Sequence, residues 1–233
     1  ERHASPGAPR ATQWWTWPAE YRDPRSPAVA GFRERETDAV DFRCWLQFEL
    51  DRQLADAAAV ATASGCALGL YQDLALGAGR ASADVWMAQD AVAGGVHLGA
   101  PPDDYAPDGQ DWGLAPLDPH RLRADAYRGW SRLLRAMFTS TGVLRIDHAI
   151  GLMRQFWIPA GRSGRDGGYV AYPANDLLGV LALESHRARS VVVAEDLGTV
   201  PPELPGLLED WGLLRSAVVH FSRDAVGGFR PSD

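Results

Sequence analysis

Apolar residues recur three and four positions apart in four stretches of the chain, which predicts four helices. The longest covers about residues 41–63, and Gly65 supplies its C-terminal stop. A second amphipathic helix covers 118–137 and opens with an Asp-Pro pair, a capping residue followed by proline at the first helical position. Shorter helices are expected over 175–183, capped by its first residue, Asn175, and over 202–211.

Nearly continuous apolar runs alternate with these helices and predict strands. The runs cover residues 67–74, 143–147, 190–194 and 214–221, and a short irregular strand is expected over 167–172. Strands that alternate with helices are typical of right-handed βαβ units in a parallel sheet. The fold class is therefore α/β, and either a (β/α) barrel or a doubly wound sheet fits this order.

Two segments lack this periodicity. Residues 1–40 are rich in Pro, Arg and Trp, and we expect a loop-rich N-terminal segment that precedes an α/β domain over 41–233. Residues 77–118 hold much Gly, Pro and Asp, which favours a long loop. A loop of that length in a compact domain is usually functional.

Composition narrows the possible partners. The chain has 233 residues, is 46% hydrophobic and carries a formal net charge of -7. A negative balance argues against nucleic acid and against anionic membranes, since both attract clustered positive charge. There is no apolar run of membrane-spanning length and no apolar signal core at the start. The chain begins with Glu1, so we expect an internal piece of a longer, cytoplasmic protein.

Three kinds of chemistry receive no support. Every basic residue is arginine, which excludes a Schiff-base lysine within this segment. The two cysteines, Cys44 and Cys66, are expected to be buried free thiols without a chemical role. His, Cys and carboxylate residues nowhere have convincing metal-ligand spacing, and no cofactor is expected.

Two carboxylates follow the ends of apolar strands, and they are the strongest candidates for chemistry. Asp147 ends the run over 143–147, and Glu195 follows the run over 190–194. Active sites of parallel α/β proteins lie at the carboxyl ends of the strands. Two acids held there suit retaining glycoside chemistry, in which one is the nucleophile and the other the acid and then the base.

Neighbouring residues fit these roles. Arg145 lies two positions before Asp147, so it projects to the same side of the strand and could support that carboxylate by charge-assisted hydrogen bonding. Glu195 follows four apolar residues, which is typical of the apolar surroundings that an acid catalyst needs. Asp196 is expected to point away, and His148 fits either a site residue or a hydrogen-bonded scaffold residue.

These residues alone leave a second interpretation open, in which the two acids have only structural roles. An aspartate after an apolar strand is commonly a helix cap or a turn former. An unrelated α/β domain, whose strand-end acids only cap helices, would contain the same two runs.

Several motifs favour a catalytic role of the two acids over a structural one. In their order along residues 14–221, these motifs resemble the amylomaltases, the 4-α-glucanotransferases of glycoside hydrolase family 77. The matching motifs are Trp45-Leu46-Gln47 with Gln53, Gly69-Leu70-Tyr71-Gln72-Asp73-Leu74, Ala83-Asp84-Val85-Trp86, Gly99-Ala100-Pro101-Pro102-Asp103, Gly109-Gln110-Asp111-Trp112-Gly113, Leu144-Arg145-Ile146-Asp147-His148, Phe156-Trp157-Ile158-Pro159 and Ala194-Glu195-Asp196-Leu197-Gly198-Thr199.

The resemblance implies a (β/α)8 TIM barrel of the α-amylase superfamily, incomplete here and spanning about its third to sixth strands, so that 41–233 is a partial catalytic barrel. It implies that Asp147 is the nucleophile, Glu195 the acid/base and Arg145 the residue that supports the nucleophile. The implied partners are α-1,4-glucans and malto-oligosaccharides, and the implied substrate-binding residues are Asp73, Asp103, Trp112 and His148.

The chain also departs from the family pattern. Asp104 stands where many relatives have an aromatic residue, and Leu114-Ala115 stands where they often have Asn-Pro. A third catalytic carboxylate of the family follows the seventh strand, which this chain does not reach. The expected function of the complete protein is that of a 4-α-glucanotransferase with a retaining double-displacement mechanism, and the activity of the fragment alone stays open. The alternatives are a retaining α-glucan hydrolase and an inactive glucan-binding remnant.

Overall fold

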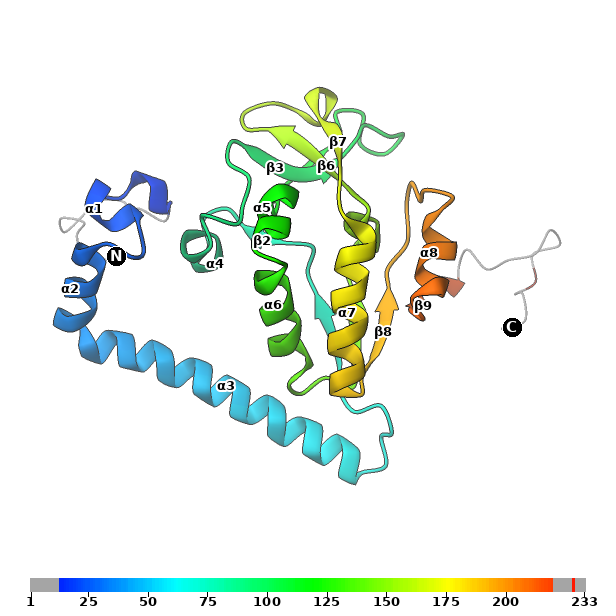
Figure 1. Ribbon diagram of the computed structural model, residues 1–233, viewed down its shortest axis with the longest axis horizontal. Helices are drawn as coiled ribbons and strands as arrows, with labels where there is room; N and C mark the ends of the chain where they lie inside the picture. The colour runs from blue at the N-terminus through cyan, green and yellow to red at the C-terminus, as the bar shows by residue number, and fades with distance from the viewer. Residues whose placement is uncertain (1–12, 220–227, 229–233) are drawn as a thin grey trace.

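The computed structural model describes residues 13–219 and Gly228, and these residues form two sheets. A parallel sheet carries helices on one face, and an antiparallel sheet lies beyond the carboxyl ends of its strands (Figure 1). Three helices at the N-terminus extend away from both sheets.

Four strands in chain order form the parallel sheet, as the βαβ pattern predicts. They are β1 (Tyr71–Leu74), β5 (Val143–Ile146), β8 (Val191–Ala194) and β9 (Leu214–Arg215). The predicted strand over 214–221 is shorter than expected within the described residues, and His220 and Phe221 lie outside them. The predicted strand over 67–74 likewise begins only at Tyr71.

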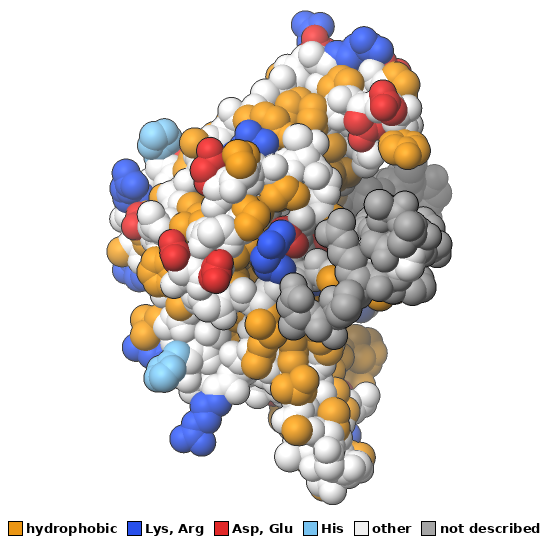
Figure 2. All heavy atoms as spheres, turned by 90° about the vertical axis from the view of Figure 1, so that its right-hand side faces the viewer, with side chains coloured by type: hydrophobic (Ala, Val, Ile, Leu, Met, Phe, Trp, Pro, Cys, Tyr) orange, Lys and Arg blue, Asp and Glu red, His pale blue; other side chains and the backbone are white. Residues whose placement is uncertain are grey.

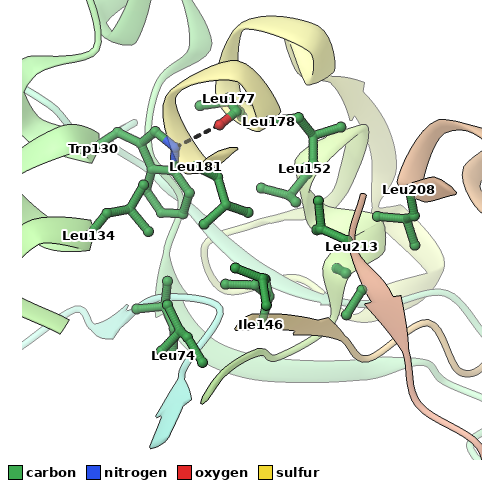
Figure 3. Close-up of a cluster of buried hydrophobic side chains, with 14 of the residues drawn as sticks. Leu74, Trp130, Leu134, Ile146, Leu152, Leu177, Leu178, Leu181, Leu208 and Leu213 are labelled. Atoms are coloured by element: carbon green, nitrogen blue, oxygen red, sulfur yellow. Dashed lines mark hydrogen bonds between the residues drawn. The ribbon is translucent and has the colours of Figure 1, made fainter. Parts of the chain in front are cut away.

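The helices between these strands cover one face of the sheet and form the core with it. They are α5 (Pro119–Ala124), α6 (Arg128–Phe138), α7 (Ala174–Ala188) and α8 (Leu204–Asp210). Leu134 on α6 and Leu178 on α7 are fully buried (Figure 3). Leu144 on β5 is fully buried in the same cluster. The indole of Trp130 also lies in this core, and its Nε1 donates to the Leu177 carbonyl at 3.1 Å.

The segment predicted as a long loop over 77–118 is largely structured, which corrects the prediction. It holds β2 (Ala78–Gly79), α4 (Ala83–Met87), β3 (Val96–Ala100) and β4 (Gln110–Ala115). Together with β6 (Arg154–Pro159) and β7 (Gly168–Ala171), its strands form an antiparallel sheet in the order β2-β4-β3-β6-β7. Because β3 pairs with β6, more than fifty residues later, no local pattern reveals the strand.

Two other expectations about helices are wrong. The helix predicted over 118–137 is broken, since Ala126 and Tyr127 adopt left-handed backbone angles between α5 and α6. Asn175 does not cap α7, because Pro173 occupies that position and the Asn175 side chain accepts from Trp211 instead. The cap at Asp118 is confirmed, with its side chain accepting from two backbone N–H groups.

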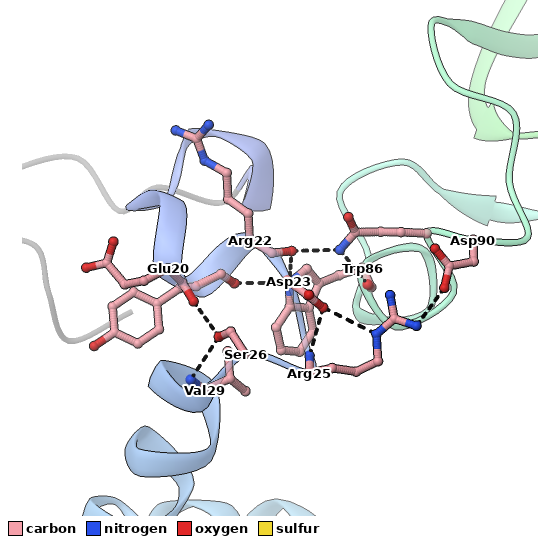
Figure 4. Close-up of polar contacts among 10 residues, drawn as sticks. Glu20, Arg22, Asp23, Arg25, Ser26, Val29, Trp86 and Asp90 are labelled. Atoms are coloured by element: carbon pink, nitrogen blue, oxygen red, sulfur yellow. Dashed lines mark hydrogen bonds and ion pairs between the residues drawn. The ribbon is translucent and has the colours of Figure 1, made fainter.

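The N-terminal segment is more helical than expected. It contains the 3-10 helix η1 (Trp14–Thr16), α1 (Ala19–Arg22) and α2 (Pro27–Arg35). Polar contacts tie it to the region of α4 (Figure 4): Arg25 pairs with Asp90 at 2.7 Å, and the Trp86 indole donates to the Arg22 carbonyl at 3.0 Å. The proposed boundary between residues 1–40 and 41–233 stays a prediction.

The longest helix, α3 (Thr37–Ala63), has no buried side chain. Phe42, Trp45 and Phe48 are more than half exposed. The cysteines share this environment: Cys44 lies on α3 and Cys66 just after it, and both are exposed, so the prediction of buried thiols is wrong. Figure 2 shows one face of the molecule, where hydrophobic side chains gather in the lower part of the view with few charges among them.

Candidate functional site

The structure brings Asp147 and Glu195 to neighbouring strand ends. Ile146 and Ala194 are paired in the parallel register of β5 and β8, and the two acids follow directly. The backbone pairing of the two strands continues one residue beyond Ala194, since the Glu195 N–H donates to the Ile146 carbonyl at 2.9 Å. Two carboxylates one residue beyond a paired position lie at the same edge of the sheet.

Alternation along β5 decides which face carries the polar groups. Leu144 and Ile146 belong to the hydrophobic core beneath the helices. Successive side chains on a strand point to opposite faces, so Arg145 and Asp147 lie on the face away from the helices. In a (β/α) barrel that face is the inside of the barrel.

Arg145 joins the ends of β1 and β5. Its Nη1 donates to both carboxylate oxygens of Asp73 at 2.7 Å and to Oδ1 of Asp147 at 3.0 Å. These bonds raise the pKa of the guanidinium above its ordinary value, the bond to Asp73 most of all. The contact with Asp147 follows the sequence prediction. The contact with Asp73 was missed, although Asp73 stands opposite Arg145 in the register.

The Glu195 carboxylate is held by backbone donors. Its Oε2 accepts from the His148 N–H at 2.8 Å, and its Oε1 accepts from the Leu197 N–H at 3.0 Å. The expectation of apolar surroundings is therefore only partly right, because the strand before Glu195 lies in the core while the carboxylate itself meets two N–H groups. Backbone donors carry no signal in a sequence.

His148 follows Asp147 and has a left-handed backbone, with φ 47° and ψ 56°. Its half-buried ring meets the Trp112 ring edge to face, with 5.3 Å between the ring centroids. Burial lowers the pKa of the His148 imidazole below its ordinary value, although the carboxylates of Glu195 and Asp147 act in the opposite direction. Burial therefore favours the neutral form of the ring.

Trp112 brings the hairpin of β3 and β4 next to the strand ends. It lies on β4, its ring contacts His148, and its Nε1 donates to the Gln110 side chain at 3.1 Å. Gln110 was not among the predicted site residues. Its position two residues before Trp112, on the same side of a strand, is the signal that identifies it.

Asp103 and Asp196 form their hydrogen bonds with groups other than the carboxylate pair. Asp103 is exposed in the loop between β3 and β4, where its Oδ1 accepts from the backbone N–H groups of Tyr105 and Ala106. Those hydrogen bonds shape the loop itself. Asp196 is buried and pairs with Arg215 at 2.5 Å, so its side chain points away from that of Glu195, as expected.

Residues 13–219 and 228 contain neither a candidate metal site nor a candidate membrane span. No group of three or more His, Cys, Asp or Glu residues in that part of the chain could hold a metal ion. No helix there combines the length and the apolar character that a membrane span needs.

Sequence comparisons show which known proteins this chain resembles. The sequence model of the family described as 4-α-glucanotransferase, glycoside hydrolase 77, matches residues 7–233. The curated 4-α-glucanotransferase of Mycobacterium tuberculosis strain H37Rv is 45% identical over 211 residues, which are 91% of this chain and 29% of that protein. The one from Haemophilus influenzae is 36% identical over 224 residues, 96% and 32% of the two chains. The chain thus spans about a third of these relatives.

Solved structures agree on the fold. The amylomaltase of Corynebacterium glutamicum superposes with a TM-score of 0.76 and 37% identity, over 80% of this chain and 27% of that one. An amylomaltase from Streptococcus agalactiae superposes with a TM-score of 0.80 over 90% and 43% of the two chains, and at 19% identity this likeness concerns the fold alone. The incomplete TIM barrel is confirmed, and the chain belongs to the 4-α-glucanotransferase family, glycoside hydrolase 77.

Proposed function

We propose that the protein carrying this chain is a 4-α-glucanotransferase, which moves α-1,4-glucan segments to the 4-hydroxyl of an acceptor glucan or glucose. The observation that carries the proposal is the placement of Asp147 and Glu195 directly after paired positions of neighbouring parallel strands. Family membership and relatives that bear this name support it.

The proposed reaction has two displacements at the same sugar carbon. In the first, Glu195 protonates the glycosidic oxygen of the leaving glucan while Asp147 attacks the anomeric carbon, which forms a covalent glucosyl-enzyme. In the second, Glu195 takes the proton from the 4-hydroxyl of the acceptor. That oxygen then displaces Asp147, so the new bond keeps the α configuration.

The neighbouring groups support these roles. The guanidinium of Arg145 stabilises the Asp147 carboxylate before it attacks, at a donor–acceptor distance of 3.0 Å. The two backbone N–H groups fix the orientation of the Glu195 carboxylate for both proton transfers. Acid, base and nucleophile all come from the chain itself, and no cofactor enters this reaction.

We propose α-1,4-glucans and malto-oligosaccharides as substrates. Trp112 would offer its ring to a sugar face beside the strand ends, and Asp73 and Asp103 would meet sugar hydroxyls. His148 is adjacent to both carboxylates. The solved amylomaltase of Streptococcus agalactiae is in complex with acarbose, so acarbose is a suitable probe for this site. A cytoplasmic location belongs to the same proposal.

Products from maltotriose test the proposal in the full-length protein. Transfer gives glucose together with oligosaccharides longer than the substrate, at a constant number of reducing ends. A steady gain of reducing ends without longer products would instead indicate the alternative, a retaining α-glucan hydrolase on the same barrel. Binding of acarbose without turnover would indicate an inactive glucan-binding remnant.

Two substitutions test the residue roles. Asp147→Asn and Glu195→Gln should each lower kcat by about 10²- to 10⁴-fold, the usual contribution of such groups. Asp56→Asn makes the same carboxylate-to-amide change on the exposed surface of α3. It is the matched control and should leave turnover intact. Unchanged turnover in both site variants would refute the assignment of the pair.

A further inference from the structure

We propose that His148 is a positioning residue that acts on Glu195 through its backbone rather than its ring. The left-handed conformation of His148 directs the main chain after β5 toward the end of β8, where it holds the Glu195 side chain. This inference rests on the proposed role of Glu195 as the acid/base.

Two successive N–H groups reach the same residue. The His148 N–H donates to Oε2 of Glu195 at 2.8 Å, and the Ala149 N–H donates to the Glu195 carbonyl oxygen at 2.8 Å. One bond fixes the carboxylate and the other fixes the main chain that bears it. In an extended strand, successive N–H groups point in opposite directions, so a single residue cannot receive both.

The backbone at His148 explains how both bonds form. With φ at 47°, the chain leaves the strand direction and enters a buried 3-10 helix, η2 (Ala149–Leu152). Few residues other than glycine adopt such angles, and His, Asn and Asp are the ones most often found there. For β-branched residues the same angles are strongly disfavoured.

The His148 ring lies against the β3–β4 hairpin. It packs edge to face on Trp112, with an angle of 78° between the rings. Among the described residues, neither ring nitrogen has a hydrogen-bond partner, whereas the backbone N–H does. The contacts therefore place the backbone, not the imidazole, on the acid/base.

Substitutions that differ in their tolerance of left-handed angles separate the two roles. In the full-length protein, His148→Val should lower kcat on maltotriose by about 10- to 100-fold, the effect of losing a hydrogen bond to a charged group, with little change in KM. His148→Gly and His148→Asn should recover most of the lost kcat, and His148→Ala should fall between.

Arg189 provides the matched control. It is also a non-glycine residue with a left-handed backbone, φ 57°, but it ends α7 and precedes β8 at the far end of the strands. Arg189→Val imposes the same kind of backbone conflict. It should lower the melting temperature without the loss of kcat that His148→Val produces at temperatures where both variants are folded.

The outcomes distinguish this inference from the proposed function. If Glu195→Gln leaves turnover unchanged, the proposed function itself is wrong. If Glu195→Gln abolishes turnover while the four His148 variants lose activity equally, or lose it through KM, the ring binds sugar and the positioning role is refuted. Should His148→Val fail to fold, the order of His148→Gly, His148→Asn and His148→Ala in kcat decides alone.

Discussion

At the scale of single residues, Arg145 connects two carboxylates that would otherwise repel each other. One nitrogen, Nη1, serves both Asp73 and Asp147, and its bonds to Asp73 are the shorter ones. Asp73 thus holds the guanidinium where it meets the proposed nucleophile. Removing the cation should affect both acids at once.

We expect Arg145→Met to lower kcat by about 10- to 100-fold, since a charge-assisted hydrogen bond to the nucleophile is lost. The control is Arg52→Met, which removes exposed ion pairs with Glu49 and Asp56 on α3. An unchanged kcat in Arg145→Met would contradict the role of Arg145.

The imidazole of His148 predicts a pH dependence of stability. Burial holds its pKa in the folded protein below the ordinary 6.5, so the unfolded chain takes up a proton at a higher pH. The stability contributed by the neutral ring is complete above that value and is lost as the pH falls. Between about pH 7.5 and pH 5, the wild-type melting temperature should fall further than that of His148→Asn. Equal losses in thermal unfolding would refute this.

Residue-scale features were predictable where the strand pattern fixed them. The nearness of Asp147 and Glu195, and the contact of Arg145 with Asp147, follow from strand ends and period-two alternation. The donors at Glu195 could not be predicted, because they are backbone groups aimed by the angles at His148 and by the turn to Leu197. Nor did the sequence reveal that Asp103 bonds within its own loop.

At the scale of elements, the buried acid Glu184 joins α6 and α7. Its side chain is only 3% exposed, and it accepts from Ser131 at 2.8 Å, from Arg135 at 3.0 Å and from Arg187 at 3.1 Å. These donors, with Arg135 foremost, hold the pKa of Glu184 below its ordinary value. The helices therefore depend on a charged carboxylate between them.

Arg135→Ala should lower the free energy of unfolding, but by less than the loss of a fully buried charged hydrogen bond, because Arg135 is largely exposed to solvent. Because the folded pKa of Glu184 lies below its unfolded value, this contribution is present above about pH 4.5 and disappears as the pH falls lower. Urea unfolding at neutral pH and near pH 3 measures both effects. The exposed Arg132→Ala on the same helix is the control and should change stability little.

Prediction of the elements succeeded where local pattern and tertiary structure agree. The strands β5 and β8 lie within one residue of their predicted ends, because an apolar run specifies a strand buried on one face against helices. The break between α5 and α6 escaped prediction, since the apolar spacing continues across Ala126 and Tyr127. The antiparallel sheet escaped it because its short strands depend on pairing with distant residues.

At the scale of the whole molecule, the described chain is an open part of a barrel. Its parallel sheet ends at β1 on one side and β9 on the other, each paired on one side only within the described residues. Closure of a barrel removes such edges. The helix α3 extends from the body (Figure 1), and its apolar residues Phe42, Trp45 and Phe48 are more than half exposed. Since the relatives are about three times as long, both features fit surfaces that meet further chain.

The exposed apolar surface of α3 predicts the behaviour of the 233-residue chain produced by itself. Exposed apolar side chains that gather on one helix promote association. The chain should therefore self-associate in sedimentation experiments and bind a hydrophobic dye. Trp45→Glu combined with Phe48→Glu should reduce both, because the two side chains are 52% and 62% exposed. Gln47→Glu with Gln53→Glu adds the same charge to the same helix without removing apolar surface, and should reduce them less. A monomeric wild-type chain that binds no dye would contradict this account of α3.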